Sequence, residues 1–200
     1  IAADIDGDTL TYSIVDNGTK GTVTITNAAT GAYSYVPNAN ENGSDTFTFK
    51  VNDGTVDSNT STVTVTITPV NDKPTANAGT LTTDEDTTGT GTLLGSDIEG
   101  SALTYSIVTN GTKGTATITD AATGAYSYVP NANANGSDTL TFKVNDGNLD
   151  SSPATITVTI TPVNDAPTTS VGTVTTNEDT TGTGTLIAAD IDGDTLTYSI

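Results

Sequence analysis

The sequence predicts an all-β fold made of tandem Greek-key β-sandwiches arranged end to end. Two observations predict it. Apolar residues alternate with threonine along short runs bounded by Gly, Asn and Asp, and no window shows a sustained helical period. Sequence motifs also repeat with a period of 93 residues, so that Tyr12, Tyr105 and Tyr198 lie in the same Leu-Thr-Tyr-Ser-Ile motif.

The repeat also predicts how the chain is divided. Residues 68–74 and 161–167 share the word Thr-Pro-Val-Asn-Asp-x-Pro, whose two prolines favour a short, stiff, extended connector. We therefore expect an incomplete unit over 1–73 that lacks its start, a complete unit over 74–166, and the start of a third unit over 167–200. A unit of this size can bury a modest core of its own.

Period-two alternation places the strands of the complete unit. It predicts them at residues 80–83, 91–94, 103–107, 115–119, 125–129, 139–144 and 154–160. One face of each run is apolar, and the threonines on the other face are β-branched and tolerate solvent. Asn-Gly and Asp-Gly pairs mark the turns. Because the tyrosines and phenylalanines fall on the apolar faces, we assign them to the core rather than to a ligand surface.

Composition excludes several classes of function. The formal charge is −19, with five Lys and Arg residues against 24 acids, which argues against nucleic acid as a partner. It favours cations as partners, or simple solubility. The chain has no Cys and no His, so it has no disulfides and no sulfur or imidazole ligands for zinc or copper.

The carboxylates recur in three words. Asp-x-Asp-Gly-Asp occupies residues 4–8 and 190–194, Asx-Glu-Asp-Thr occupies 84–87 and 177–180, and Val-Asn-Asp lies in both connectors and before Gly54 and Gly147. All are expected between strands, at the poles of the sandwiches. Packed carboxylates repel unless a cation joins them, and calcium takes six to eight oxygen ligands. The alternative is that they are turn residues on a solvated acidic face.

These words together resemble cadherin repeats. Ala-Ala-Asp-Ile-Asp followed by Thr-Tyr-Ser-Ile resembles the cadherin phrase in which a DxD pair precedes a YSI strand. Val-Asn-Asp-x-Pro resembles the interdomain DxNDNxP linker, and Val-Asn-Asp-Gly the aspartate before the last strand. The whole chain is most similar to the cadherin-like tandem repeats of large RTX-type bacterial surface adhesins. The resemblance implies a cadherin- or immunoglobulin-like sandwich, and Ca²⁺ at the junctions that stiffens an extended stalk.

The resemblance also implies metal ligands, residue by residue. At the second junction they are Glu85, Asn164, Asp165, Asp190 and Asp192. At the first junction they are Asn71, Asp72, Asp97, Glu99 and Asp146. The top of the first unit would use Asp4, Asp6 and Asp53. The connector lacks the leading Asp and trailing Asn of the family pattern, and Asn133 and Asn135 replace an acidic pair, which implies fewer ions per junction than in cadherins.

The leading functional hypothesis is a calcium-rigidified extender of a secreted or surface-anchored bacterial adhesin, outside the cell, that supports cell adhesion or biofilm formation. The alternative is a recognition module for homophilic or glycan binding. We expect no enzyme, because only paired carboxylates remain for catalysis, and therefore no small-molecule substrate. Neighbouring repeats are the expected partners. Head-to-tail self-association is also expected, because residues 167–200 carry a copy of the opening strands that the first unit lacks. A membrane would be reached only through other parts of the full protein.

Overall fold

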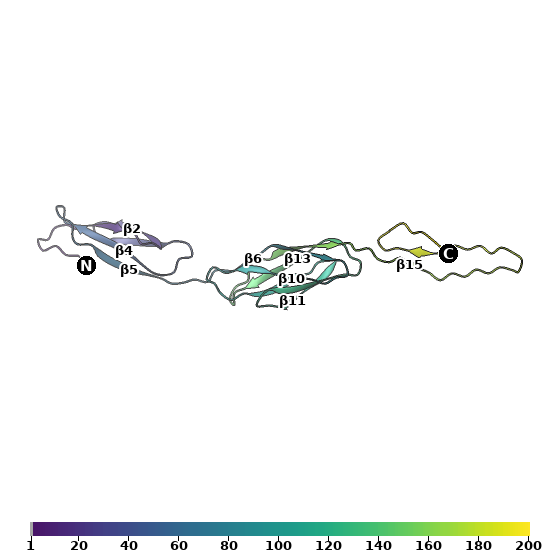
Figure 1. Cartoon of the computed structure of the whole chain (residues 1–200). Coiled ribbons are helices and arrows are strands. Elements are labelled where there is room, and N and C mark those ends of the chain that lie inside the picture. Colours follow the sequence, from purple (N-terminus) through teal and green to yellow (C-terminus); the bar gives the residue numbers. More distant parts are fainter. Residues whose placement is uncertain (1) are drawn as a thin grey trace. The chain divides into compact units, whose positions relative to one another are not determined.

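The computed structural model describes residues 2–200, so Ile1, the first residue of the first predicted unit, lies outside it. The chain forms two compact units, Ile1–Asn71 and Asp72–Ile200, called unit 1 and unit 2 below (Figure 1). Every regular element among residues 2–200 is a β-strand, which confirms the predicted all-β class. It follows that this part of the chain offers no helix able to cross a membrane.

Unit 2 contains a two-sheet β-sandwich. The first sheet has the strand order β10 (Thr104–Thr109), β13 (Gly136–Asn145), β14 (Ala154–Thr161) and β7 (Gly79–Asp84). The second has the order β11 (Gly114–Asp120), β12 (Ala125–Pro130) and β8 (Gly89–Thr92). Neighbouring strands are antiparallel except β14 and β7, which run parallel. Two short strands, β6 (Thr75–Asn77) and β9 (Leu94–Ser96), form a separate pair.

The core of unit 2 lies between these two sheets. Side chains from both sheets, together with Leu93 between β8 and β9, form one buried cluster: Leu93, Ala116, Tyr126, Tyr128, Leu140, Phe142, Val144, Ile156, Val158 and Ile160. Along β14 the burial alternates strictly, with Ile156, Val158 and Ile160 inside and the threonines between them outside. The period of two in the sequence therefore becomes one buried and one solvated face.

Two details of the strands differ from the expectation. The run predicted at 91–94 is divided between β8 and β9, because the chain leaves the sheet at Leu93 to insert that fully buried side chain into the core. Strand β6 was not predicted, since its three residues, Thr-Ala-Asn, are too short to show an alternation.

Unit 1 repeats part of this arrangement. One sheet contains β1 (Thr11–Asp16), β4 (Gly43–Asn52) and β5 (Ser61–Ile67), and the other contains β2 (Gly21–Asn27) and β3 (Ala32–Pro37). The registers equal those of the corresponding strands in unit 2. The described residues of unit 1 contain no counterpart of β7 or β8. The last part of unit 2 adds only β15 (Thr168–Thr169) paired with β16 (Ala188–Ala189).

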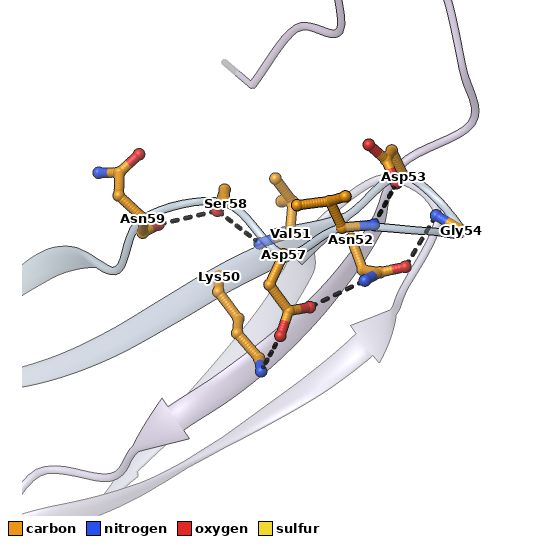
Figure 2. A network of polar contacts seen from close by, with 9 residues as sticks. Lys50, Val51, Asn52, Asp53, Gly54, Asp57, Ser58 and Asn59 are labelled. Atoms are coloured by element: carbon orange, nitrogen blue, oxygen red, sulfur yellow. Dashed lines mark hydrogen bonds and ion pairs between the residues drawn. The ribbon is translucent and has the colours of Figure 1, made fainter.

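A polar network closes the loop after the longest strand of each unit. In unit 1 the Lys50 ammonium lies 2.5 Å from Asp57 Oδ2, and the Asn52 amide donates to Asp57 Oδ1 over 2.9 Å (Figure 2). Lys143, Asn145 and Asp150 repeat both contacts in unit 2. These half-exposed ion pairs add little stability, but they fix the loops that carry Asp53 and Asp146.

Candidate metal centre

Six polar residues gather near the second connector in unit 2, and we call them the 165 cluster: Glu85, Asp86, Asn133, Asp165, Asp190 and Asp192. They come from four segments that the fold brings together. Glu85 and Asp86 follow β7, Asn133 lies between β12 and β13, and Asp165 follows β14. The last two, Asp190 and Asp192, follow β16.

Glu85 is the buried member of the 165 cluster. Only 3% of its surface is exposed. Its backbone N–H donates to the Thr161 carbonyl over 2.9 Å, and its Oε1 accepts from the Val163 N–H over 2.6 Å, so both ends of the residue are tied to the connector. Its other oxygen, Oε2, is buried without a hydrogen-bond partner. A buried carboxylate oxygen without a partner is costly, and a cation would satisfy it.

Asp165 links the connector to the acidic loop beyond it. Its backbone N–H donates to Asp192 Oδ2 over 2.7 Å, and the Asp192 N–H donates to Asp190 Oδ1 over 3.1 Å. Burial raises the pKa of the Asp165 carboxyl, and repulsion from four neighbouring acids raises it further: Asp192, Asp86, Glu85 and Asp190. The carboxylates are therefore close enough to disfavour one another's charge.

Asp86 and Asn133 belong to the cluster although they were not among the predicted ligands. Asp86 Oδ1 accepts from the Asn133 N–H over 3.1 Å. The Asn133 side-chain amide lies 3.1 Å from Asp165 Oδ2 and 3.3 Å from Asp86 Oδ2, and it donates to both when its nitrogen faces them. Both residues have positive φ angles, 56° and 53°, a conformation that Asn and Asp tolerate best. Asp86 is part of the Asx-Glu-Asp-Thr motif, so this motif could have indicated it as a member of the site.

The donor set matches a hard cation of flexible coordination. Carboxylate, amide and carbonyl oxygens are the ligands that calcium prefers, and Glu85 Oε2 is a buried oxygen without a hydrogen-bond partner. Within the described residues, however, no three acidic side chains already converge at metal-binding distance.

A related acidic loop lies near the first connector, also in unit 2. Asp97 Oδ1 accepts from the Glu99 N–H over 3.1 Å and from the Ser101 N–H over 2.9 Å, while its buried Oδ2 has no hydrogen-bond partner. The Asp72 N–H donates to Glu99 Oε2 over 3.2 Å, the contact that Asp165 and Asp192 make at the second connector. Glu99 thus takes the position of Asp192.

The remaining predicted ligands are less closely grouped. Asp146 is buried in its own turn, where Oδ1 accepts from the N–H groups of Asn148 and Leu149. Asn164 is exposed beside the 165 cluster and donates to the Asp165 carbonyl. Asn71 belongs to unit 1 rather than to unit 2.

At the top of unit 1, the structure builds the predicted ligands into two separate turns. Asp4 Oδ1 accepts from the N–H groups of Asp6 and Asp8 over 2.8 and 3.1 Å. Asp53 Oδ1 accepts from the Val56 and Thr55 N–H groups, and these bonds lower the pKa of Asp53. Satisfied turn carboxylates of this kind need no cation to be stable, so the observations that point to a metal lie in unit 2.

Two family models match the chain. A model described as bacterial Ig domain matches residues 71–159, and one described as bacterial cadherin-like domain matches residues 1–69. These two parts of the chain are thus similar to bacterial immunoglobulin-like and cadherin-like domains. No curated protein matches it.

Two solved structures of cadherin repeats have a fold similar to that of this chain. Human CDH23 repeats EC21-23 are 18% identical with a TM-score of 0.60, over 95% of this chain and 76% of that one. Human protocadherin-24 EC1-2 is 16% identical with a TM-score of 0.58, over 82% of this chain and 87% of that one. An endo-fucoidan hydrolase of glycoside hydrolase family 107 is 25% identical over 79% of this chain, but the chain spans only 24% of that protein and the TM-score is 0.38. That last likeness carries no argument about activity.

Proposed function

We propose that the chain is a calcium-stiffened extender module of a secreted or surface-anchored bacterial adhesin, in which repeats are joined end to end. The observation that carries the proposal is the 165 cluster. Its acids come from both sides of the second connector and repel one another, and Glu85 Oε2 is buried without a partner. The domain types support the setting, since bacterial immunoglobulin-like and cadherin-like domains are typical of surface proteins and are typically not enzymes.

Different residues of the 165 cluster hold different segments near the second connector. Glu85 anchors the connector to the end of β7 through Val163 and Thr161, and therefore sets where the connector leaves the sandwich. Asp165 places the loop of Asp190 and Asp192 through its backbone N–H. A bound calcium ion would neutralise the repulsion among these carboxylates, and by binding oxygens from several segments it would link those segments together. Binding to the folded form alone also stabilises that form.

The recognition alternative has weaker support in the structure. Glycan sites usually present exposed aromatic rings, but Tyr126 and Tyr128 of unit 2 are 3% and 0% exposed. Tyr33 of unit 1 is half-exposed beside the open face of its sheet. No row of exposed tyrosines forms among the described residues of unit 2's sandwich, so an extender remains the function that the geometry supports best.

Native mass spectrometry tests the proposal on the 200-residue chain. We expect bound calcium that a chelator removes, and a lower calcium content in Asp165→Asn. Asp179→Asn is the matched control, because Asp179 repeats Asp86 in the exposed segment after the second connector. Nitrogen-15 relaxation should show residues 168–192 becoming ordered in calcium but not in magnesium, which prefers small octahedral sites.

Two results would contradict the proposal. One is a wild-type chain that binds no calcium at millimolar concentration. The other is a calcium content and backbone order that Asp165→Asn leaves unchanged, since the connector aspartate would then not be a ligand.

A further inference from the structure

The chain contains four Asn-Gly pairs, which fall at two equivalent places in each unit. Asn17 and Asn110 lie before β2 and β11, while Asn42 and Asn135 lie directly before β4 and β13. All four asparagines are exposed, so exposure does not distinguish them. In an Asn-Gly pair the glycine nitrogen can attack the preceding side-chain amide with little hindrance, because glycine has no Cβ. The contacts around each pair therefore decide which of them can react.

The first place in each unit holds its asparagine side chain fixed. Asn110 Oδ1 accepts from the Ala116 N–H over 2.6 Å, and in unit 1 Asn17 Oδ1 accepts from the Val23 N–H over 2.8 Å. The glycine that follows each of them lies against a buried aspartate, where an added Cβ would come within 1.9 Å of a carboxylate oxygen. A side-chain amide held in this way is not free to turn its carbon toward the next backbone nitrogen.

The second place leaves its asparagine side chain free and brings a cation to its backbone. In the part of the chain that the structure describes, the side chains of Asn42 and Asn135 make no hydrogen bond. The Lys113 ammonium lies 2.7 Å from the Asn135 backbone oxygen, and the Lys20 ammonium lies 2.5 Å from the Asn42 backbone oxygen. Each ammonium thus donates to the carbonyl of the peptide bond whose nitrogen belongs to the following glycine.

This contact favours the first step of a deamidation. The glycine nitrogen must lose its proton to solvent base before it attacks, and the negative charge that develops is shared with the carbonyl oxygen of the same peptide bond. An ammonium group on that oxygen stabilises the charge as it forms, and a charged donor does so more strongly than a neutral one. The geometry therefore places a charged donor where the reaction needs it, at the same position in both units.

We propose that Asn42 and Asn135 deamidate spontaneously, each activated by the lysine on its backbone carbonyl, whereas the asparagines at the first place are protected. At Asn135 the deprotonated Gly136 nitrogen attacks Cγ, and a cyclic imide forms. The side-chain nitrogen takes a proton from water and leaves as ammonia. Water then opens the ring: attack at Cγ gives aspartate, and attack at the backbone carbonyl carbon gives isoaspartate, in which the chain continues through Cγ.

The product carries one added negative charge beside a lysine. In isoaspartate the free carboxylate contains the oxygen that Lys113 already contacts, so the hydrogen bond becomes an ion pair. The ammonium also polarises this carbonyl toward attack by water, which favours isoaspartate over aspartate. Asn133 of the 165 cluster lies in the same loop between β12 and β13, so the modification adds charge to a loop that the cluster uses.

Peptide mapping by mass spectrometry tests the proposal on the folded 200-residue chain, incubated in mildly alkaline buffer. Asn42 and Asn135 should gain the mass of deamidation about tenfold faster than Asn17 and Asn110, since both a hydrogen bond and the lysine contact distinguish the two places. In urea the four rates should converge, because unfolding removes the protection and the lysine contact together.

Lysine variants separate activation from exposure. Lys113→Met should slow the reaction of Asn135 by about threefold and leave that of Asn42 unchanged, so the same chain contains the reference. It should also lower the share of isoaspartate, which electron-transfer fragmentation distinguishes from aspartate. Lys113→Arg should restore the rate, because a guanidinium also donates to the carbonyl. A slow reaction at Asn110 in both variants reports that unit 2 is still folded.

Three results would overturn the proposal. One is an equal rate at all four asparagines in the folded chain. Another is a ratio of the Asn135 and Asn42 rates that Lys113→Met leaves unchanged. The third is an equal slowing of Asn135 by Lys113→Met and Lys113→Arg, because the lysine would then act through its shape and not through its charge.

Discussion

Glu85→Gln should change the stability of unit 2 in opposite directions with and without calcium. Glutamine keeps the oxygen that accepts from Val163, because Oε1 can remain where it is. It replaces the buried, unpartnered Oε2 by an uncharged amide nitrogen, and so removes one of the charges that repel Asp165. The substitution thus removes a charge and a possible metal ligand while it preserves the shape of the site.

The magnitude follows from the burial of Glu85, which is 3% exposed. An unpartnered buried group costs about 1–3 kcal/mol, and more when it is charged, so in chelator the neutral variant should be more stable than the wild type by about 1–2 kcal/mol. In calcium at a hundredfold excess over Kd the wild type gains about 2.7 kcal/mol, and the variant should lose most of that gain. The order of stability should therefore invert.

Urea unfolding followed by the Leu93 methyl NMR signal reports on unit 2 alone, since Leu93 is at the centre of its core. Glu178→Gln is the control, because Glu178 repeats Glu85 in an exposed segment and should have no effect in either buffer. If Glu85→Gln lowered the midpoint equally in calcium and chelator, Glu85 would be a structural anchor of the connector and not a ligand.

Two further predictions concern the sandwich itself. Leu93→Ala should destabilise unit 2 by about 2–5 kcal/mol in urea, whereas Leu186→Ala, at the 63% exposed copy, should change stability by less than about 0.5 kcal/mol. Equal effects would refute the assignment of Leu93 to the core. Asp138 should contribute to acid stability: burial raises its pKa, but hydrogen bonds from Tyr128, Thr112 and Lys113 outweigh that and hold the pKa below its usual value. The contribution of Asp138 to the free energy of unfolding is complete above about pH 4 and is lost as pH falls through the folded-state pKa. Tyr128→Phe should therefore weaken the loss of stability at acid pH. An unchanged dependence of stability on pH would contradict the role of this hydrogen bond.

The sequence predicted the strands well because each is a local pattern. The alternation of Ile156, Val158 and Ile160 with threonine is visible in seven letters, and the structure buries the three apolar residues. Strand β6 was missed because three residues carry no period. The break between β8 and β9 was missed because it depends on how the Leu93 side chain packs in the core. That packing is set by residues of other strands and cannot be read from the local sequence.

The candidate site was only partly predictable, for a different reason. The predicted ligands Glu85, Asp165, Asp190 and Asp192 do lie near one another. Asp86 and Asn133 also belong there, and what places them is the left-handed backbone at both positions. A positive φ in one loop and its distance from another loop follow from tertiary packing, which no single word of the sequence encodes.

Burial, finally, is a property of neighbours rather than of a segment. The six residues of β3 and of β12 are the same, and both form a strand with the same register on the preceding strand. Only β12 buries its tyrosines, because β8 pairs with its edge and Leu93 packs in the same core cluster. The alternation therefore predicts which face needs a cover, and the repeat shows which segment has the sequence to provide one.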